Sequence, residues 1–210
     1  MRSYPLLVVT AVSAEADAIR AGLDPADVVI EAVGVGPAAA AAGTARLLAG
    51  RAYRAVVSIG IAGGFPGRAD VGSLVIATRS IAADLGAESP GGFLPIEDLG
   101  FGTSVLDADP HLVKALQIAL PHAVPGDVLT LATVTGTAAT ADRLATRFPL
   151  AAAEAMEGYG VATAAADAGV PFAELRAISN PVGPRDRAAW RLGEAFAALR
   201  AAAPAVATLP

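Results

Sequence analysis

Three side chains that could do acid–base or hydrogen-bonding chemistry each follow a short apolar run of the sequence: Glu15, Glu157 and Asn180. A carboxylate can act as a general base or accept hydrogen bonds, and an amide can both donate and accept them. In an open α/β sheet, ligands bind beyond the carboxyl ends of the strands. We therefore expect these two carboxylates and the amide to face one crevice.

Small and hydroxyl-bearing residues follow the same apolar runs. The segment Gly60–Gly64 is rich in glycine, and glycine lets the backbone approach a ligand closely because it has no Cβ. A tight turn is the alternative explanation for these glycines. The further candidate binding residues of this kind are Ile61, Ala62, Gly63, Thr135 and Ser179.

Several other kinds of site lack part of their motif. The run Gly34–Ala39 fits the start of a dinucleotide-binding fingerprint, but no acidic residue follows between Glu31 and Asp70 to hold a ribose. His111 and His122 flank a predicted helix at a spacing that cannot place both on one face, and the chain has no cysteine. Neither a P-loop nor a G-x-S-x-G motif is present. We therefore expect no metal and no nicotinamide or flavin cofactor.

The elements that would position these residues alternate between short apolar runs and helical patterns, which is typical of strand–helix units around a largely parallel sheet. We predict one α/β domain over residues 1–210, a three-layer αβα sandwich with a central, mixed, largely parallel twisted sheet. The expected strands are Leu6–Ala11, Val28–Val33, Ala55–Ile59, Ser73–Ala83, Val128–Thr133, Ala152–Met156 and Ala173–Ser179. The expected helices are Ala14–Ala21, Pro37–Ala49, Pro110–Leu120, Ala138–Arg147, Glu157–Ala168 and Arg185–Ala203.

The longest predicted irregular stretch runs from Asp84 to Gly102 and is rich in Gly, Pro and acidic residues. Loops of that length in a compact domain tend to be functional.

Composition excludes two classes of partner. The 210 residues are 54% hydrophobic and carry a net charge of −5, with the positive charge scattered along the chain, which argues against nucleic acid. The longest runs without a charged residue have 14 residues, too few to span a membrane. Arg2 and the run from Leu6 to Val12 imitate a secretory signal, but the same run fits a buried strand equally well. We expect a cytoplasmic protein.

Four segments, in this order, resemble the nucleoside phosphorylase and nucleosidase superfamily. They are Ala11–Glu15, Ser58–Gly64, Phe148-Pro149 followed by Glu154–Glu157, and Leu175–Asn180. Each is weak alone, but together they span nearly the whole chain at comparable spacing. Within the superfamily, the run Ser179–Arg187 and the short length resemble the futalosine hydrolases of menaquinone biosynthesis. This resemblance implies a small nucleoside substrate, hydrolysis without a cofactor, and a homo-oligomer.

The resemblance also assigns roles to three residues. Hydrolysis of a ribosyl N-glycosidic bond passes through an oxocarbenium-like sugar and needs a base for water, an acceptor near the ribose, and a group that stabilises the departing base. Glu15 matches the carboxylate that activates water, Glu157 the one that accepts hydrogen bonds from the ribose hydroxyls, and Met156 the apolar residue against the sugar. The alternative for both carboxylates is a structural role at a helix start. For Glu154 we expect a structural role.

Asn180 departs from the pattern of the adenine-type nucleosidases, which carry Asp there. Asp can protonate N7 and accept from a 6-amino group. An amide can accept from N7–H and donate to a 6-oxo group, which matches hypoxanthine, the base of futalosine. The residue thus predicts a preference for 6-oxopurines, and capping of the following segment is the alternative.

Two further departures favour water over phosphate as the nucleophile. Ile61 stands where the superfamily often has a Ser that phosphorylases use toward phosphate, and the turn after the first strand has no Arg before Arg20. The alternative functions are a 6-oxopurine nucleosidase or phosphorylase of the same superfamily and a non-catalytic nucleoside-binding protein.

The two ends of the substrate are less well defined. Futalosine carries a benzoate at the far end of its ribose, and Arg185 or Arg187 could supply a cation for it, unless both belong to a solvated helix start. We expect Trp190 in the core or an interface rather than at the ligand. The candidates for the residue that stacks on the purine are Phe65, Phe93, Phe101 and Tyr159.

Overall fold

The structure, a computed structural model, describes residues 4–23 and 27–210. Its strands are β1 (Leu6–Thr10), β2 (Val28–Ala32), β3 (Ala55–Gly64), β4 (Leu74–Ala82), β5 (Gly86–Ser89), β6 (Gly92–Pro95), β7 (Val105–Asp107), β8 (Val124–Thr130), β9 (Ala151–Ala155) and β10 (Phe172–Pro181). Its helices are α1 (Ser13–Arg20), α2 (Pro37–Gly50), α3 (Pro110–Ala119), α4 (Ala138–Arg147), α5 (Gly158–Asp167), the 3₁₀-helix η1 (Arg187–Ala189) and α6 (Leu192–Ala207).

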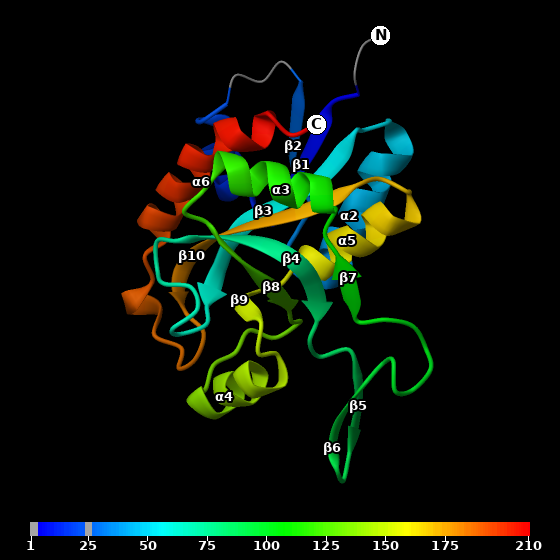
Figure 1. Ribbon diagram of the computed structural model, residues 1–210, viewed down its shortest axis with the longest axis vertical. Coiled ribbons are helices and arrows are strands. Elements are labelled where there is room, and N and C mark those ends of the chain that lie inside the picture. Colours follow the sequence, from blue (N-terminus) through cyan, green and yellow to red (C-terminus); the bar gives the residue numbers. More distant parts are fainter. Residues whose placement is uncertain (1–3, 24–26) are drawn as a thin grey trace.

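One mixed sheet forms the centre of the described chain, in the order β10-β4-β8-β9-β3-β1-β2, with β7 paired to β4 (Figure 1). β1 pairs in parallel with β2 and β3, as does β10 with β3 and β8 with both β4 and β9. The pairs β10–β4, β3–β9 and β4–β7 are antiparallel. The sheet is therefore mixed and largely parallel, as predicted.

The sheet also closes on itself. β10 pairs with both β3 and β4, so that β3, β9, β8, β4 and β10 form a ring from which β1 and β2 extend. The apolar runs of the sequence do not predict this closure, because the closure depends on which strands pair.

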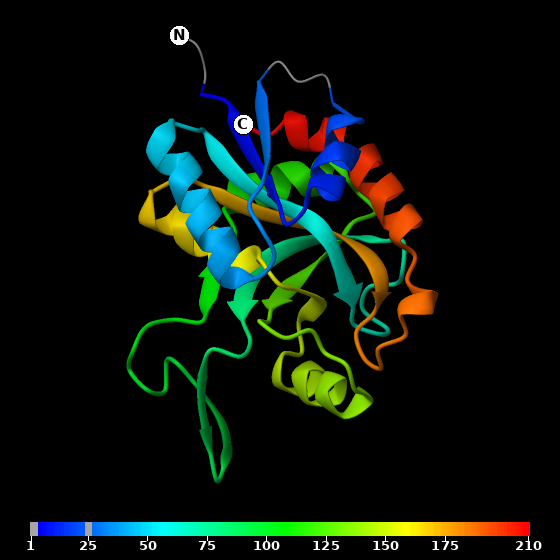
Figure 2. The same cartoon turned by 180° about the vertical axis from the view of Figure 1, so that it is seen from behind.

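Helices cover both faces of the sheet and complete the three layers that the sequence predicts (Figures 1 and 2). α1, α3 and α6 bury apolar side chains with Val8, Ile59 and Leu175 of the sheet. α2 and α5 pack on the opposite face, where Gly160 approaches Pro37 so closely that a Cβ would lie 2.2 Å from its carbonyl oxygen. Each fully buried aliphatic side chain of such a core contributes about 1.5–3 kcal/mol.

Two strands are longer than the sequence predicts, and both changes affect the site. β3 continues through Gly60–Gly64, so the tight-turn alternative for these glycines is wrong. β10 continues through Asn180 to Pro181, because Asn180 and Pro181 pair with Gly63 and Gly64 of β3. The two extensions stabilise each other because they pair with each other. The glycine content of the segment does not predict this pairing.

The last helix begins later than expected. We predicted a helix from Arg185, but Gly183 adopts a positive φ of 144° and α6 starts only at Leu192. The short η1 lies in between, with Asp186 accepting a hydrogen bond from the Ala188 amide at its start. Arg185 and Trp190 therefore lie in an irregular connection instead of on the predicted helix.

The expected irregular segment after Asp84 contains a two-stranded hairpin, β5–β6, that projects from the body of the molecule in both views (Figures 1 and 2). Arg147 lies over the ring of Phe93 on this hairpin, 3.9 Å from its centre, and ties it to α4.

The N-terminal run Leu6–Thr10 is a buried strand between β2 and β3, in agreement with the strand interpretation. Arg2, on which the signal alternative also drew, lies outside the described residues. Within residues 4–23 and 27–210, no helix is long and apolar enough to cross a membrane.

Candidate active site

A cavity of about 230 Å³ opens beyond the carboxyl ends of β1, β3 and β10. Its wall contains ten of the candidate residues from the sequence: Glu15, Ile61, Ala62, Gly63, Thr135, Met156, Glu157, Ser179, Asn180 and Arg185. These residues come from segments spread over most of the chain, and the strand pairing of β3 with β9 and β10 brings them together.

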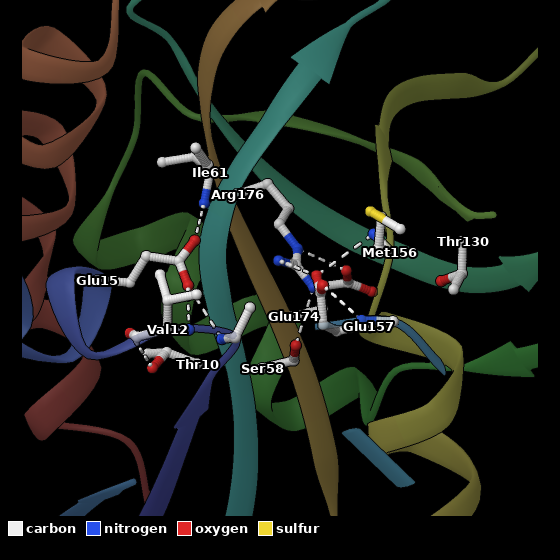
Figure 3. Close-up of polar contacts among 12 residues, drawn as sticks. Thr10, Val12, Glu15, Ser58, Ile61, Thr130, Met156, Glu157, Glu174 and Arg176 are labelled. Atoms are coloured by element: carbon white, nitrogen blue, oxygen red, sulfur yellow. Dashed lines mark hydrogen bonds and ion pairs between the residues drawn. The ribbon is translucent and has the colours of Figure 1, made fainter. Parts of the chain in front are cut away.

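Glu15 lies in the first turn of α1, and its carboxylate folds back over the start of that helix (Figure 3). Its Oε2 accepts hydrogen bonds from the amides of Ala11 (2.9 Å) and Val12 (3.2 Å), and its Oε1 accepts one from the amide of Ile61 (2.9 Å). The residue is only 3% exposed. Burial raises the pKa of Glu15 above its usual value, against the opposing effects of the Ile61 amide and the charge of Arg176.

Arg176 is the largest fully buried side chain of the described residues, and its guanidinium lies among three polar partners (Figure 3). Nε donates to Glu174 at 2.8 Å, Nη2 to the hydroxyl of Ser58 at 3.0 Å, and Nη1 to Glu157 at 3.4 Å. Burial opposes the charge, but Glu174 and Glu157 outweigh it and hold the pKa of Arg176 above its usual range. Glu174 also accepts a short hydrogen bond from Ser80.

Removing one partner from such a buried group typically costs about 3–5 kcal/mol, because a charge is left uncompensated. We predicted no role for Arg176 from the sequence. The signal was present, since a charged residue stands inside the apolar run Leu175–Ile178.

Glu157 stands between β9 and α5 and is 6% exposed. Its side chain makes no capping hydrogen bond to α5, so the helix-cap alternative is wrong. Instead Oε1 accepts from the amide of Gly36 at 3.2 Å, while Oε2 faces Arg176. Met156, half-buried beside it, lines the same cavity.

Asn180 lies within β10 and does not cap a helix, so that alternative is also wrong. Its Oδ1 accepts a hydrogen bond from the hydroxyl of Ser179 at 2.8 Å, and its Nδ2 donates to the carbonyl of Pro181 at 3.0 Å. The amide is thereby oriented before any ligand binds, with the same hydroxyl also reaching the Ala62 carbonyl at 3.3 Å.

The wall opposite contains Thr135 and Glu154. The amide of Thr135 donates to Glu154 Oε1 at 2.7 Å, and its hydroxyl donates to Oε2 at 2.5 Å. Glu154 is 6% exposed, and burial raises its pKa against the effect of these two hydrogen bonds.

The charges in the cavity wall are mainly negative. Glu15, Glu154 and Glu157 line it, and Arg185 is its one basic residue within the described part of the chain. Over residues 4–23 and 27–210, no group of three or more His, Cys, Asp or Glu side chains could hold a metal ion.

Comparison with known proteins assigns the chain to a family. Residues 8–209 match the phosphorylase superfamily. The chain belongs to the phosphorylase superfamily. This confirms the family that the four sequence segments indicated.

Two relatives within the superfamily cover almost the whole chain. Futalosine hydrolase from Streptomyces coelicolor is 56% identical over 92% of this chain and 91% of its own length. Futalosine hydrolase from Acidothermus cellulolyticus is 50% identical over 95% of this chain and 92% of its own length.

Solved structures of the superfamily share the fold. The 5′-methylthioadenosine/S-adenosylhomocysteine nucleosidase from Colwellia psychrerythraea, in complex with adenine, superposes with a TM-score of 0.84 at 24% identity, covering 99% of this chain and 95% of that one. Futalosine hydrolase of Helicobacter pylori gives a TM-score of 0.81 at 15% identity, covering 96% of this chain and 95% of that one. These likenesses confirm the α/β fold with a mixed central sheet.

Two residues that we did not expect at the ligand line the cavity. Glu154, for which we expected a structural role, and Trp190, expected in the core or an interface, both line it. The four aromatic candidates, Phe65, Phe93, Phe101 and Tyr159, are absent from its wall. Trp190 is thus the one aromatic side chain there among the described residues, and Arg187 lies over its ring at 5.9 Å instead of lining the cavity.

Proposed function

We propose that this protein hydrolyses the N-glycosidic bond of futalosine and releases hypoxanthine. The observation that carries the proposal is the meeting of Glu15, Glu157 and Asn180 in one cavity, in a chain 56% identical to a futalosine hydrolase. Each of these side chains has the chemistry that one part of the reaction requires.

Glu15 acts as the general base for water. Desolvation makes its carboxylate a stronger base than a solvated one, while the three backbone amides fix its orientation. As the bond to the base breaks, the water loses a proton to Glu15 and its oxygen bonds to the anomeric carbon of the ribose. General-base catalysis of this kind contributes about 10²–10⁴-fold to the rate.

Glu157 and Met156 hold the sugar. The Glu157 carboxylate accepts hydrogen bonds from the ribose hydroxyls, and its negative charge lies close to the sugar as positive charge develops there. The contact with Arg176 and the Gly36 amide keeps this carboxylate in place. Met156 provides an apolar surface against the ring.

Asn180 stabilises the departing base. The electron pair of the broken bond goes to N9, and the base takes up a proton from solvent at N7, because an amide cannot supply one. Asn180 Nδ2 donates to the 6-oxo group and its Oδ1 accepts from the resulting N7–H of hypoxanthine. A site that pairs with one exocyclic group can reject the other by up to about 10⁴–10⁵-fold, because a mismatched polar group is left unpaired.

Water is favoured over phosphate by the charges of the wall. Three glutamates and one arginine line the described cavity. The buried Arg176 beside Glu15 and Glu157 is itself paired with Glu174, so carboxylates still outnumber guanidinium groups around the site and oppose an anionic nucleophile. Ile61, whose side chain lines the cavity, has no hydroxyl to offer a phosphate.

Arg185 and Trp190 bind the far end of the substrate. Both line the cavity, and they provide a cation for the benzoate carboxylate and a flat apolar surface for its ring. Arg187 lies over Trp190 and holds that surface from outside the cavity. We also propose a homo-oligomer, as the resemblance to the superfamily implies, and a cytoplasmic location.

The deciding experiment measures base release from futalosine, inosine and methylthioadenosine, each with and without phosphate, by chromatography. Release of hypoxanthine from futalosine that is independent of phosphate supports the proposal. Phosphate-dependent release from inosine would make the protein a phosphorylase. Binding of all three nucleosides without turnover would make it a nucleoside-binding protein.

A further inference from the structure

Glu154 and Asn180 stand on either side of Gly63 in the sheet. Gly63 of β3 is the register partner of Glu154 in β9 and of Asn180 in β10. Neighbouring strands are about 4.8 Å apart, so the two Cα atoms are about 10 Å from each other. Both residues line the cavity, and a Cβ on Gly63 between them would lie 3.3 Å from Asn180 Nδ2 and 3.0 Å from Val182 Cγ2, so the missing side chain leaves room for these two groups of the wall. The pair therefore brackets one compartment of the cavity.

The Glu154 carboxylate is held in a fixed orientation and still has acceptor capacity. Thr135 donates one hydrogen bond to each of its oxygens, at 2.7 and 2.5 Å. Each carboxylate oxygen has two lone pairs, so each can accept one more hydrogen bond. The Thr135 amide already donates to Glu154 and cannot donate to a bound purine. This part of the wall therefore offers the purine the carboxylate oxygens as acceptors.

The bases that could enter differ in what they present to such a wall. A 6-oxopurine carries a hydrogen on N1, which is a donor, whereas N1 of adenine is an acceptor. An ionised carboxylate is an acceptor only, so it pairs with the first base and is left unpaired, or repelled by a lone pair, with the second.

We propose that Glu154 is a second specificity-determining residue of the site, which accepts a hydrogen bond from N1–H of the 6-oxopurine while Asn180 contacts the adjacent edge of the base, at N7 and the 6-oxo group. This inference rests on the proposed function. It gives Glu154 a role in binding the base in addition to its structural contact with Thr135. It also explains why the base compartment has a carboxylate although Asn180 carries no charge.

The test measures the binding of free bases by calorimetry, so that it does not depend on turnover. Hypoxanthine, 1-methylhypoxanthine and adenine are titrated into the wild-type protein and into Glu154→Gln. The methyl group removes N1–H and adds the same bulk in both proteins. The affinity for hypoxanthine divided by that for 1-methylhypoxanthine is therefore compared between the wild-type protein and the variant, and the change in this quotient isolates the contact between Glu154 and N1–H. Asp127→Asn is the matched control, because Asp127 is a 1%-exposed strand carboxylate paired to Arg79 and absent from the cavity wall.

We expect Glu154→Gln to weaken hypoxanthine binding by about 10–100-fold, the usual range for a hydrogen bond to a charged group. Binding of 1-methylhypoxanthine should hardly change, and adenine should bind as well or better, because the new amide can donate to its N1. Asp127→Asn should leave the ratios between the three bases at their wild-type values.

An equal loss of affinity for all three bases in Glu154→Gln would overturn the inference, since it would mean that Glu154 only holds Thr135 in place. Thermal melting of the variant checks that it is folded, and Glu154→Asp, which keeps the charge but shortens the side chain, provides a second variant for the same ratios. Failure of the proposed function is distinguishable. In that case the wild-type protein would not release hypoxanthine from futalosine, whatever its preference among free bases.

Discussion

The carboxylate of Glu15 and the guanidinium of Arg176 meet over the Cα of Gly60. A Cβ built on Gly60 would lie 2.7 Å from Glu15 Oε1 and 2.7 Å from Arg176 Nη1, so the two atoms are no more than twice that distance apart. The positive charge lowers the pKa that burial raises in Glu15. Gly60 therefore allows the base and its stabilising cation to share one space.

Gly60→Ala should disrupt this arrangement. The new methyl group would overlap both charged groups, and both are held by other hydrogen bonds that resist displacement. We expect kcat/KM for futalosine to fall by at least about 100-fold, since misplacing a catalytic group by about 1 Å can cost that much. Gly50→Ala, at the end of α2 with no atom within 4 Å of the added methyl group, is the control and should retain wild-type activity. Equal activity of the two variants would contradict the role of Gly60.

Glu15→Gln should remove the general base while keeping the side-chain shape. We expect kcat to fall by about 10²–10⁴-fold with little change in the affinity for a bound product, because the lost interaction belongs to the transition state. Steady-state kinetics together with calorimetry of hypoxanthine separates the two quantities. Glu31→Gln, on the exposed part of β2, is the control. Losses of equal size in rate and affinity would show that Glu15 is a binding residue instead.

The pH profile should carry the signature of the same carboxylate. Only ionised Glu15 can accept the proton from water, so kcat/KM should fall as the pH drops through its raised pKa. The midpoint of this acid limb should therefore lie above 4.5, the usual value for the group. Burial also raises the pKa of Glu154, so the profile of Glu154→Gln separates the two carboxylates. An acid limb at or below pH 4.5 would contradict the assignment.

The stability of the folded protein should fall with rising pH over the range in which kcat/KM rises. The folded protein favours protonated Glu15, because its pKa is raised relative to the unfolded chain. Ionisation of this group therefore costs stability as the pH rises through the raised pKa. Glu15→Gln, which cannot ionise, should melt at a higher temperature than the wild-type protein at pH 7, and the difference should vanish at low pH. Calorimetric melting over this pH range measures it.

The sequence predicted which residues meet in the cavity better than it predicted where the surrounding strands and helices end. Glu15, Glu157 and Asn180 each follow an apolar run, and the rule that strand ends share one edge of a sheet was enough to bring them together. Helix ends with a local signal were also predicted closely, such as Pro37 at the start of α2 and Pro110 at the start of α3.

What the sequence did not reveal depends on long-range pairing. Gly60–Gly64 is a strand because it pairs with β9 and β10, and no local propensity of glycine favours that state. Arg176 is buried between Glu174 of its own strand and two polar side chains from distant segments, Glu157 and Ser58. Trp190 lines the cavity because the helix expected to carry it starts only at Leu192. In each case the missing information was the identity of a distant partner.

Arg185→Gln should discriminate between substrates by their far end. If Arg185 binds the benzoate carboxylate, its loss should raise KM for futalosine by about 10–100-fold, the range expected for a charge-assisted hydrogen bond. KM for inosine, which has no carboxylate, should stay within about two-fold. Arg46→Gln is the control, because Arg46 is an exposed residue of α2 that is absent from the cavity wall. A similar rise in KM for both nucleosides would contradict the assignment.

Asn180→Asp should shift the preference of the site from 6-oxo to 6-amino purines. The aspartate has no hydrogen for the 6-oxo oxygen when ionised, but it can accept from a 6-amino group and, when protonated, donate to N7. We expect kcat/KM for futalosine to fall by about 10³-fold or more, while that for its 6-amino analogue rises from a low starting value. Ser179 donates to Oδ1 at 2.8 Å and can donate equally well to an aspartate, whereas the hydrogen bond from Nδ2 to the Pro181 carbonyl at 3.0 Å is kept only by a protonated aspartate. Competition between the two substrates in one reaction, followed by chromatography of hypoxanthine and adenine, gives the ratio of their kcat/KM values directly. If both fall by the same factor, Asn180 contributes to the shape of the pocket and not to the choice of base.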